Sequence, residues 1–153
     1  MILAGGRASR FGGAPKGLAT VGGARILDRV AGALAPVTDA LLLVAHAPDA
    51  AAWLPGVRVV GDVHGGMGAL GGVHAALAHA GTDVLVVAWD MPFVSAGLLA
   101  ALRDAGRAGA AAVLPVHPDG HVEPLCAWYA ASCAAAAESL LLADEQRAGA
   151  LAE

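Results

Sequence analysis

The sequence predicts an α/β fold, a three-layer α/β/α sandwich in which helices cover both faces of a mostly parallel sheet. Strand-like and helix-like segments alternate along almost the whole chain, which is typical of parallel sheets. Two strand-length runs, residues 40–45 (ALLLVA) and 84–88 (VLVVA), are apolar throughout, as expected of strands buried on both faces. The chain has 153 residues, without an internal repeat or a linker, so residues 1–153 are predicted to form a single domain.

The first half of the chain begins with a short apolar strand that stops at a glycine pair. The predicted elements are a strand at 1–4, a helix at 24–34, a strand at 40–45, a helical turn at 50–54 and a strand at 57–60. The helix is predicted because Ile26, Val30 and Leu34 recur at helical spacing and Pro36 follows them.

The second half continues the alternation. Its predicted elements are a helix at 69–80, a strand at 84–88, a helix at 96–105, a strand at 110–116, an antiparallel strand at 123–129 and a helix at 130–142, with weak helix propensity at 143–153. Ser95 is a suitable N-cap, and the run 140–142 (LLL) is expected near the inner face of its helix. Gly71 and Gly72 cost about 1 kcal/mol each inside a helix, which indicates either close packing or a ligand against its first turn.

The composition excludes several classes of protein. The net charge is −4 and no basic stripe is present, which argues against nucleic acid as the main partner. No apolar run reaches the roughly 20 residues that a spanning helix needs, and no signal-peptide pattern is found. Cys126 and Cys133 have no metal-type spacing. We therefore expect free thiols in a cytoplasmic protein that binds neither membrane nor nucleic acid.

The loop at residues 5–16 (GGRASRFGGAPK) is rich in glycine and basic residues. It holds three of the nine Lys and Arg residues, and Lys16 is the only lysine in the chain. Glycines let several backbone amides point at one ligand, and such a concavity binds phosphate. The loop matches neither the G-x-x-x-x-G-K-[ST] nor the G-x-G-x-x-G pattern. It is predicted to bind phosphate; the alternative is a surface turn with ordinary charges.

Two aspartates each lie two residues after a predicted strand. Asp90 comes after 84–88, where a half-buried carboxylate calls for a cation, and Mg²⁺ fits because it binds one or two carboxylates together with phosphates. Asp62 comes after 57–60, where a carboxylate could accept both N1–H and N2–H of guanine. Either aspartate could instead be a turn or capping residue. The segments 5–16, 62–68 and 90–92 are expected to meet at the carboxyl edge of the sheet.

The remaining histidines are not expected to form a set of metal ligands. They are His64, His74, His79, His117 and His121. His74 and His79 are five residues apart, so they do not share a helix face well. Solvated or core histidines are the prediction, and His64 alone is expected near the proposed site.

Several of these segments resemble one family. The first sixteen residues resemble the L-A-G-G-x-x-x-R-[MF]-G-x-x-K signature of nucleotidyltransferases that activate sugars, alcohols and pterins, and most of all the molybdenum cofactor guanylyltransferases. The run 90–92 is similar to the family's Asp-x-Pro motif, with Trp89 where a small residue is commoner. The run 66–72 resembles Gly-Pro-Leu-x-Gly, and 123–129 (EPLCAWY) resembles the [EQ]-P-L-x-A-x-Y strand on the pterin side.

The resemblance implies a Rossmann-like nucleotidyltransferase fold. It also implies transfer of GMP from GTP to a molybdopterin-type cofactor, with Mg²⁺ as the metal and pyrophosphate as the leaving group. The implied catalytic residues are Lys16 and Asp90, with Asp90 binding the metal. The implied nucleotide-binding residues are Leu3, Ala4, Gly5, Gly6, Arg7, Arg10, Lys16, His46, Asp62 and Asp90.

The chain also departs from the family pattern. The family continues to an Asn-x-Asn-Thr-Pro segment that completes the site beside the metal, and these 153 residues contain no such segment. His46 stands where the family often has Asn. Two alternatives follow: a related transferase that uses CTP or a sugar-phosphate acceptor, or a nucleotide-binding domain without catalysis.

Overall fold

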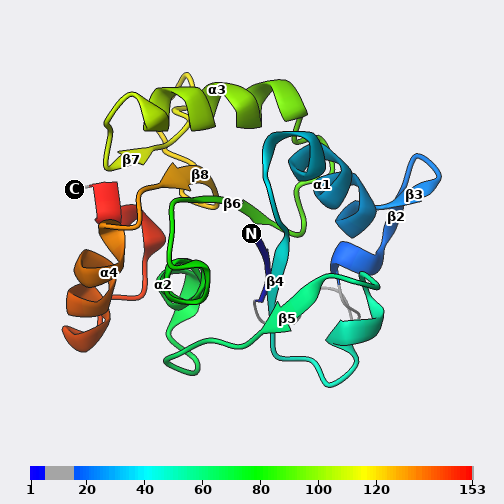
Figure 1. Cartoon of the computed structure of the whole chain (residues 1–153), viewed down its shortest axis with the longest axis horizontal. Helices are drawn as coiled ribbons and strands as arrows, with labels where there is room; N and C mark the ends of the chain where they lie inside the picture. Colours follow the sequence, from blue (N-terminus) through cyan, green and yellow to red (C-terminus); the bar gives the residue numbers. More distant parts are fainter. Residues whose placement is uncertain (6–15, 153) are drawn as a thin grey trace.

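A computed structural model describes residues 1–5 and 16–152 of the chain. The predictions made for Gly6, Arg7 and Arg10 therefore lie outside the described residues. The predicted three-layer sandwich is confirmed: a six-stranded sheet lies between two pairs of helices (Figure 1). One face packs against α1 (Ile26–Leu34) and α3 (Ala96–Arg107), and the other against α2 (Gly68–Ala80) and α4 (Cys133–Leu142).

The sheet has the strand order β5-β4-β1-β6-β8-β7. The strands are β1 (Ile2–Ala4), β4 (Leu42–Ala45), β5 (Arg58–Val60), β6 (Val84–Ala88), β7 (Ala112–Val113) and β8 (Cys126–Tyr129). Four of them, β5, β4, β1 and β6, run parallel, whereas β8 is antiparallel to β6 and β7 is antiparallel to β8. The predicted antiparallel return of the chain at 123–129 is therefore confirmed.

The order of the strands reverses beside β1. From β1 the chain crosses to β4 and then β5 on one side, and after α2 it returns to β6 on the other side. Leu3 accordingly has Val44 as its register partner on one side and Ala88 on the other. In open α/β sheets such a reversal opens a crevice at the carboxyl ends of the strands, where ligands bind.

Alternation along each strand divides the core into two layers. Ile2 and Ala4 of β1 face α1 and α3, whereas Leu3 faces α2 and α4. In β6, Val87 belongs to the first layer and Val86 to the second, and both are fully buried. Because both faces are covered, these strands are apolar throughout, which is the pattern that the sequence predicts.

Short elements complete the fold. The strands β2 (Thr20–Val21) and β3 (Ala24–Arg25) form an antiparallel hairpin around Gly22 and Gly23, both with positive φ, as a two-residue turn requires. Four 3₁₀ helices are described: η1 (Lys16–Leu18), η2 (Ala35–Val37), η3 (Ala50–Ala52) and η4 (Ala148–Ala152). Within the described ranges, no helix has both the length and the apolar character needed to cross a bilayer.

Several predicted boundaries are corrected by the structure. The helix predicted at 24–34 begins at Ile26, because residues 24–25 pair in the hairpin. The strand predicted at 110–116 is limited to residues 112–113, followed by an isolated bridge between Val116 and Val122. The helix predicted at 130–142 begins at Cys133. Of the leucine run, Leu141 is buried but Leu142 is 76% exposed, since consecutive residues point to different sides of a helix.

The glycines inside α2 allow close packing. A Cβ on Gly72 would lie 3.2 Å from Leu3 Cδ1, and one on Gly71 would lie 3.1 Å from Met67 Cβ. The helix can therefore approach β1 closely at this point. Close packing against β1, one of the two explanations considered from the sequence, accounts for Gly72, whereas the near contact of Gly71 is with Met67 at the start of the same helix. The predicted N-cap is also confirmed, because Ser95 Oγ accepts a hydrogen bond from the Leu98 amide.

Candidate functional site

Four parallel strands bring polar residues to one edge of the sheet. Gly5 follows β1, His46 follows β4, Asp62 lies two residues after β5, and Asp90 lies two residues after β6. Because these strands are parallel, all four positions lie at the carboxyl edge. This confirms that the segments after β1, β5 and β6 meet there, as far as they are described.

Lys16 and Asp90 meet at the reversal between β1 and β6. Lys16 Nζ lies 3.8 Å from Asp90 Oδ2, and the two side chains are 33% and 42% exposed. Lys16 is the first residue of η1, which leads into the hairpin, and Asp90 follows β6. An ion pair exposed to this degree contributes little to the stability of the fold. Both groups can therefore turn from each other toward a ligand with little loss of stability.

Two stacked tryptophans adjoin this pair, because Trp89 precedes Asp90 and packs against Gly17, the neighbour of Lys16. Trp89 is buried and stacks on Trp53, with ring centroids 5.2 Å apart. Gly17 is buried directly against the Trp89 indole, and a Cβ at position 17 would overlap the ring. Trp53 Nε1–H also donates a hydrogen bond to Asp49. The sequence leaves open whether Trp89 belongs to the site or only packs; its contacts are those of a packing residue that supports the site.

His46 and Asp62 form a second pair on the same edge. His46 Nε2 lies 2.8 Å from Asp62 Oδ2; the histidine side chain is 55% exposed and that of Asp62 only 12%. The short crossover from β4 to β5 makes their strand ends neighbours. A carboxylate has room for several hydrogen bonds, so Asp62 can hold the imidazole and still accept a donor from a ligand.

Residues of β1 contribute backbone rather than side chains. The side chains of Leu3 and Ala4 are buried in opposite layers of the core, whereas Gly5 is exposed. The Leu3 carbonyl already accepts a hydrogen bond from the Trp89 amide at 3.1 Å. Of these three residues, Gly5 is therefore the most open to a ligand.

A sequence model of the MobA-like NTP transferase domain matches residues 1–153. The chain belongs to this family. A probable molybdenum cofactor guanylyltransferase of Chloroflexus aggregans is 39% identical over 153 residues, covering 96% of this chain and 72% of that protein. One from Pelotomaculum thermopropionicum is 39% identical over 146 residues, covering 95% and 69% of the two chains.

Solved structures agree with this membership. The crystal structure of molybdopterin-guanine dinucleotide biosynthesis protein A from Archaeoglobus fulgidus is similar with a TM-score of 0.80 and 30% sequence identity, covering 98% of this chain and 76% of that chain. A 2-C-methyl-D-erythritol 4-phosphate cytidylyltransferase from Thermus thermophilus has a TM-score of 0.67 at 20% identity, covering 98% and 80%, which demonstrates a shared fold. As a MobA-like NTP transferase, the protein is a nucleotidyltransferase with a Rossmann-like fold.

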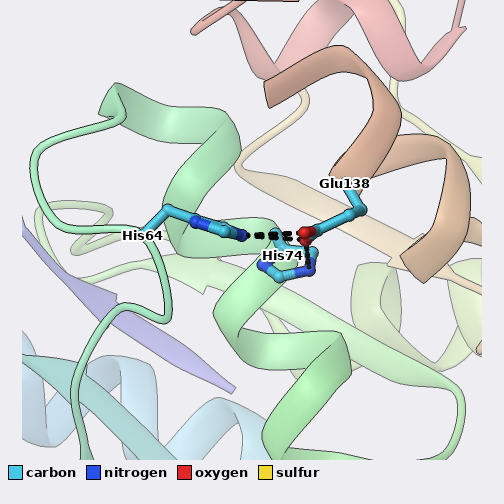
Figure 2. Close-up of side chains that lie close together, drawn as sticks. All are labelled: His64, His74 and Glu138. Atoms are coloured by element: carbon cyan, nitrogen blue, oxygen red, sulfur yellow. Dashed lines mark hydrogen bonds and ion pairs between the residues drawn. The ribbon is translucent and has the colours of Figure 1, made fainter. Parts of the chain in front are cut away.

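The MobA-like domain carries one further polar cluster, which the sequence analysis missed. His64, in the loop before α2, and His74, within α2, both approach Glu138 of α4 (Figure 2). The Nε2 atoms lie 2.9 Å and 2.7 Å from Glu138 Oε2. That His64 and His74 lie together beside a carboxylate was not expected from the sequence. No sequence signal marks the cluster, because Glu138 is distant in sequence and appears in no motif.

The other histidines considered in the sequence analysis lie elsewhere. His79 Nε2 is 3.0 Å from the Gly61 carbonyl oxygen, so it ties the end of α2 to the loop that carries Asp62. His117 and His121 lie beside each other at the Pro118–Gly120 turn, with ring centroids 6.0 Å apart. These three are surface-facing groups, as predicted for solvated histidines.

Proposed function

We propose that the protein transfers GMP from GTP to a molybdopterin-type cofactor and releases pyrophosphate. The single observation that supports this most strongly is the meeting of Lys16 and Asp90 at the strand reversal, 3.8 Å apart, in a member of the MobA-like NTP transferase family. The relatives described above carry the name molybdenum cofactor guanylyltransferase, which supports both GTP and the pterin acceptor.

In the proposed reaction, a phosphate oxygen of the acceptor attacks the α-phosphorus of GTP. A new P–O bond forms, the bond to the bridging oxygen of the β-phosphate breaks, and pyrophosphate leaves with the negative charge. Lys16 would neutralise the charge that develops on the α- and β-phosphates. Such catalysis relies on positioning and electrostatics, without a covalent enzyme intermediate.

Asp90 is the residue proposed to hold Mg²⁺. Its carboxylate is an oxygen donor, it is partly exposed, and it stands at the edge where phosphates would bind. These properties fit a magnesium ion, which binds one or two carboxylates together with substrate phosphates. When bound, the ion would supply positive charge to the phosphate oxygens. Lys16 and Asp90 are the two residues proposed as catalytic.

Asp62 is proposed to recognise guanine. A carboxylate can accept from both N1–H and N2–H of guanine, and no other common base presents this pair of donors. Asp62 is mostly shielded from water, which strengthens hydrogen bonds to its carboxylate. His46, 2.8 Å away, would orient the carboxylate and face the nucleotide.

The remaining nucleotide contacts are proposed from the motif at the amino terminus. The backbone of Leu3, Ala4, Gly5 and Gly6 would line the base and ribose, and Arg7 and Arg10 would face the pyrophosphate. The exposure of Gly5 at the end of β1 supports this arrangement. The loop residues 6–15 lie outside the described part of the chain.

A pyrophosphate-release assay tests the proposed function. The protein is incubated with Mg²⁺, molybdopterin and either GTP or CTP, and the expected result is release that requires molybdopterin and is faster with GTP. Equal or faster release with CTP would assign another nucleotide, and release with a sugar phosphate in place of the pterin would assign another acceptor. Binding of GTP without any release would overturn the enzymatic proposal.

A further inference from the structure

The cluster of His64, His74 and Glu138 contains none of the residues proposed to take part in the reaction. We propose that these three side chains form a binding site for a divalent transition metal, with Zn²⁺ as the best fit. This inference stands on the cluster itself and does not depend on the proposed function. Figure 2 shows the two imidazoles and the carboxylate converging from the loop at 61–67, α2 and α4.

The ligand atoms have the identities and spacing of such a site. Two imidazole nitrogens and one carboxylate oxygen all lie within 4.8 Å of one another. In a tetrahedral zinc site, metal–ligand bonds of about 2.0–2.1 Å place neighbouring ligand atoms about 3.3 Å apart. The His–Glu distances here are 2.7–3.0 Å. Each of these distances would lengthen by a few tenths of an ångström around a bound zinc ion.

The charge and burial of the cluster favour a cation. Among the described residues, the ion pairs of Glu138 are with the two imidazoles, so the set is anionic when both histidines are neutral. His74 is 6% exposed, and its Nδ1 has no hydrogen-bond partner within the described residues. His74 Nε2, rather than Nδ1, faces Glu138, so Nε2 is the nitrogen that would bind an ion together with the other two ligand atoms.

The donor set selects the metal. Imidazole suits zinc, copper, iron and nickel, whereas Mg²⁺ prefers an octahedron of oxygen ligands. Two histidines and one glutamate leave a coordination position for water on zinc. His64 is about one-third exposed and borders a hollow of about 440 Å³ whose lining also includes Met67 and Leu141. Solvent therefore reaches the cluster at least at His64.

The position of the cluster indicates what the metal would do. His64 is two residues from Asp62, in the loop that joins β5 to α2. His74 and Glu138 belong to helices that pack together through Leu70, Ala137 and Leu141. A metal bound here would connect the loop of Asp62 to the paired helices.

Metal binding to the full chain tests this inference directly. The EDTA-treated protein is titrated with Zn²⁺, and with Co²⁺ for its visible absorption, for the wild type and for H64N, E138Q and H79N. The wild type is expected to bind one ion per chain with a rise in melting temperature. Loss of an outer-shell partner alone costs about 10–100-fold in metal affinity, so H64N and E138Q, which each remove a ligand, should lose at least about 100-fold. H79N, which removes another histidine of α2, should bind as the wild type does, and excess Mg²⁺ should not displace the ion.

The variants are chosen so that folding does not confuse the outcome. Glu138→Gln preserves shape and still accepts hydrogen bonds, and His64 is partly exposed, so neither change opens a core cavity; melting curves in EDTA verify that both fold. If the wild type binds Zn²⁺ no more tightly than E138Q or H64N, the cluster is a hydrogen-bonded contact between the helices and the loop, and the metal site is overturned.

Discussion

The ammonium of Lys16 lies 3.8 Å from the carboxylate of Asp90, although the two residues are far apart in sequence. The contact exists because β1 and β6 are neighbours and both end at the same edge. It places the only lysine of the chain beside the acid at the end of the most apolar strand.

Replacing Lys16 should slow the transfer reaction. Lys16→Met removes the charge proposed to stabilise the transition state, and the loss of such a group costs about 10²–10³-fold in turnover. Lys16→Arg retains the charge but not the compact ammonium, so we expect partial activity. Pyrophosphate release measures both. Full activity of Lys16→Met would contradict the proposed role.

Replacing Asp90 should abolish the response to magnesium. Asp90→Asn retains the size of the side chain but loses the charge that holds a cation. Added Mg²⁺ should therefore no longer stimulate pyrophosphate release. The rate of the variant should match that of the EDTA-treated wild type. Asp104→Asn is the matched control, because Asp104 is an exposed acid paired with Arg103 on α3. Equal magnesium dependence in Asp90→Asn and the wild type would place the metal elsewhere.

Asp62 should determine the preference for guanine. ITP lacks the 2-amino group of GTP, so the wild type should favour GTP over ITP, and Asp62→Asn should lose most of this preference. A hydrogen bond to a charged group contributes about 1.5–3 kcal/mol, which corresponds to at least about tenfold in kcat/KM. Asp28→Asn, in an exposed pair with Arg25, is the control and should retain the preference. An unchanged GTP-to-ITP ratio in Asp62→Asn would remove Asp62 from base recognition.

Gly17→Ala should disturb both stability and the position of Lys16. The new methyl group would overlap the buried Trp89 ring, which is held by its stack on Trp53. Overpacking of this kind costs about 1–3 kcal/mol, measurable by urea unfolding, and turnover should fall as well. Gly32→Ala is the control, since its Cβ would meet no atom within 4 Å and alanine favours the helix. A Gly17→Ala variant as stable as Gly32→Ala would show that Trp89 can move aside.

The Cys126 thiol should be unreactive in the folded protein. Burial and the nearby Glu123 carboxylate raise the pKa of Cys126 from 9.0 to about 11. The thiolate fraction at pH 8 is thus roughly 100-fold lower than in the unfolded chain, and a thiol-specific disulfide reagent should react correspondingly slowly.

The same pKa predicts a loss of stability in base. Between about pH 9 and 11 the thiol of the unfolded chain ionises before that of the folded chain, so folding stability should decline as the pH rises through this range. Cys126→Ala should show a smaller decline. In the labelling experiment, a rapid reaction of native Cys126 with the disulfide reagent at pH 8 would contradict the burial of this thiol.

Much of the candidate site at the carboxyl edge of the sheet could be predicted from local sequence. Apolar runs such as 84–88 predict buried strands, and residues directly after such strands lie at the carboxyl edge once the strands are parallel. Asp62 and Asp90 are recognisable for this reason, and their places at the edge agree with the prediction. The short strands and exact ends, such as the start of β8 at Cys126 rather than residue 123, depend on pairing partners that no local pattern reveals.

By itself, the sequence determined the layered architecture, the edge where polar residues gather and the resemblance to the nucleotidyltransferases, because all of these follow from periodicity and short-range motifs. Only the tertiary structure decided that Trp89 stacks on Trp53 and packs against Gly17, and that His64, His74 and Glu138 converge. These contacts join elements through the packing of one helix or loop on another. The geometry of that packing depends on the whole chain. No local sequence pattern therefore indicates that these residues lie close together.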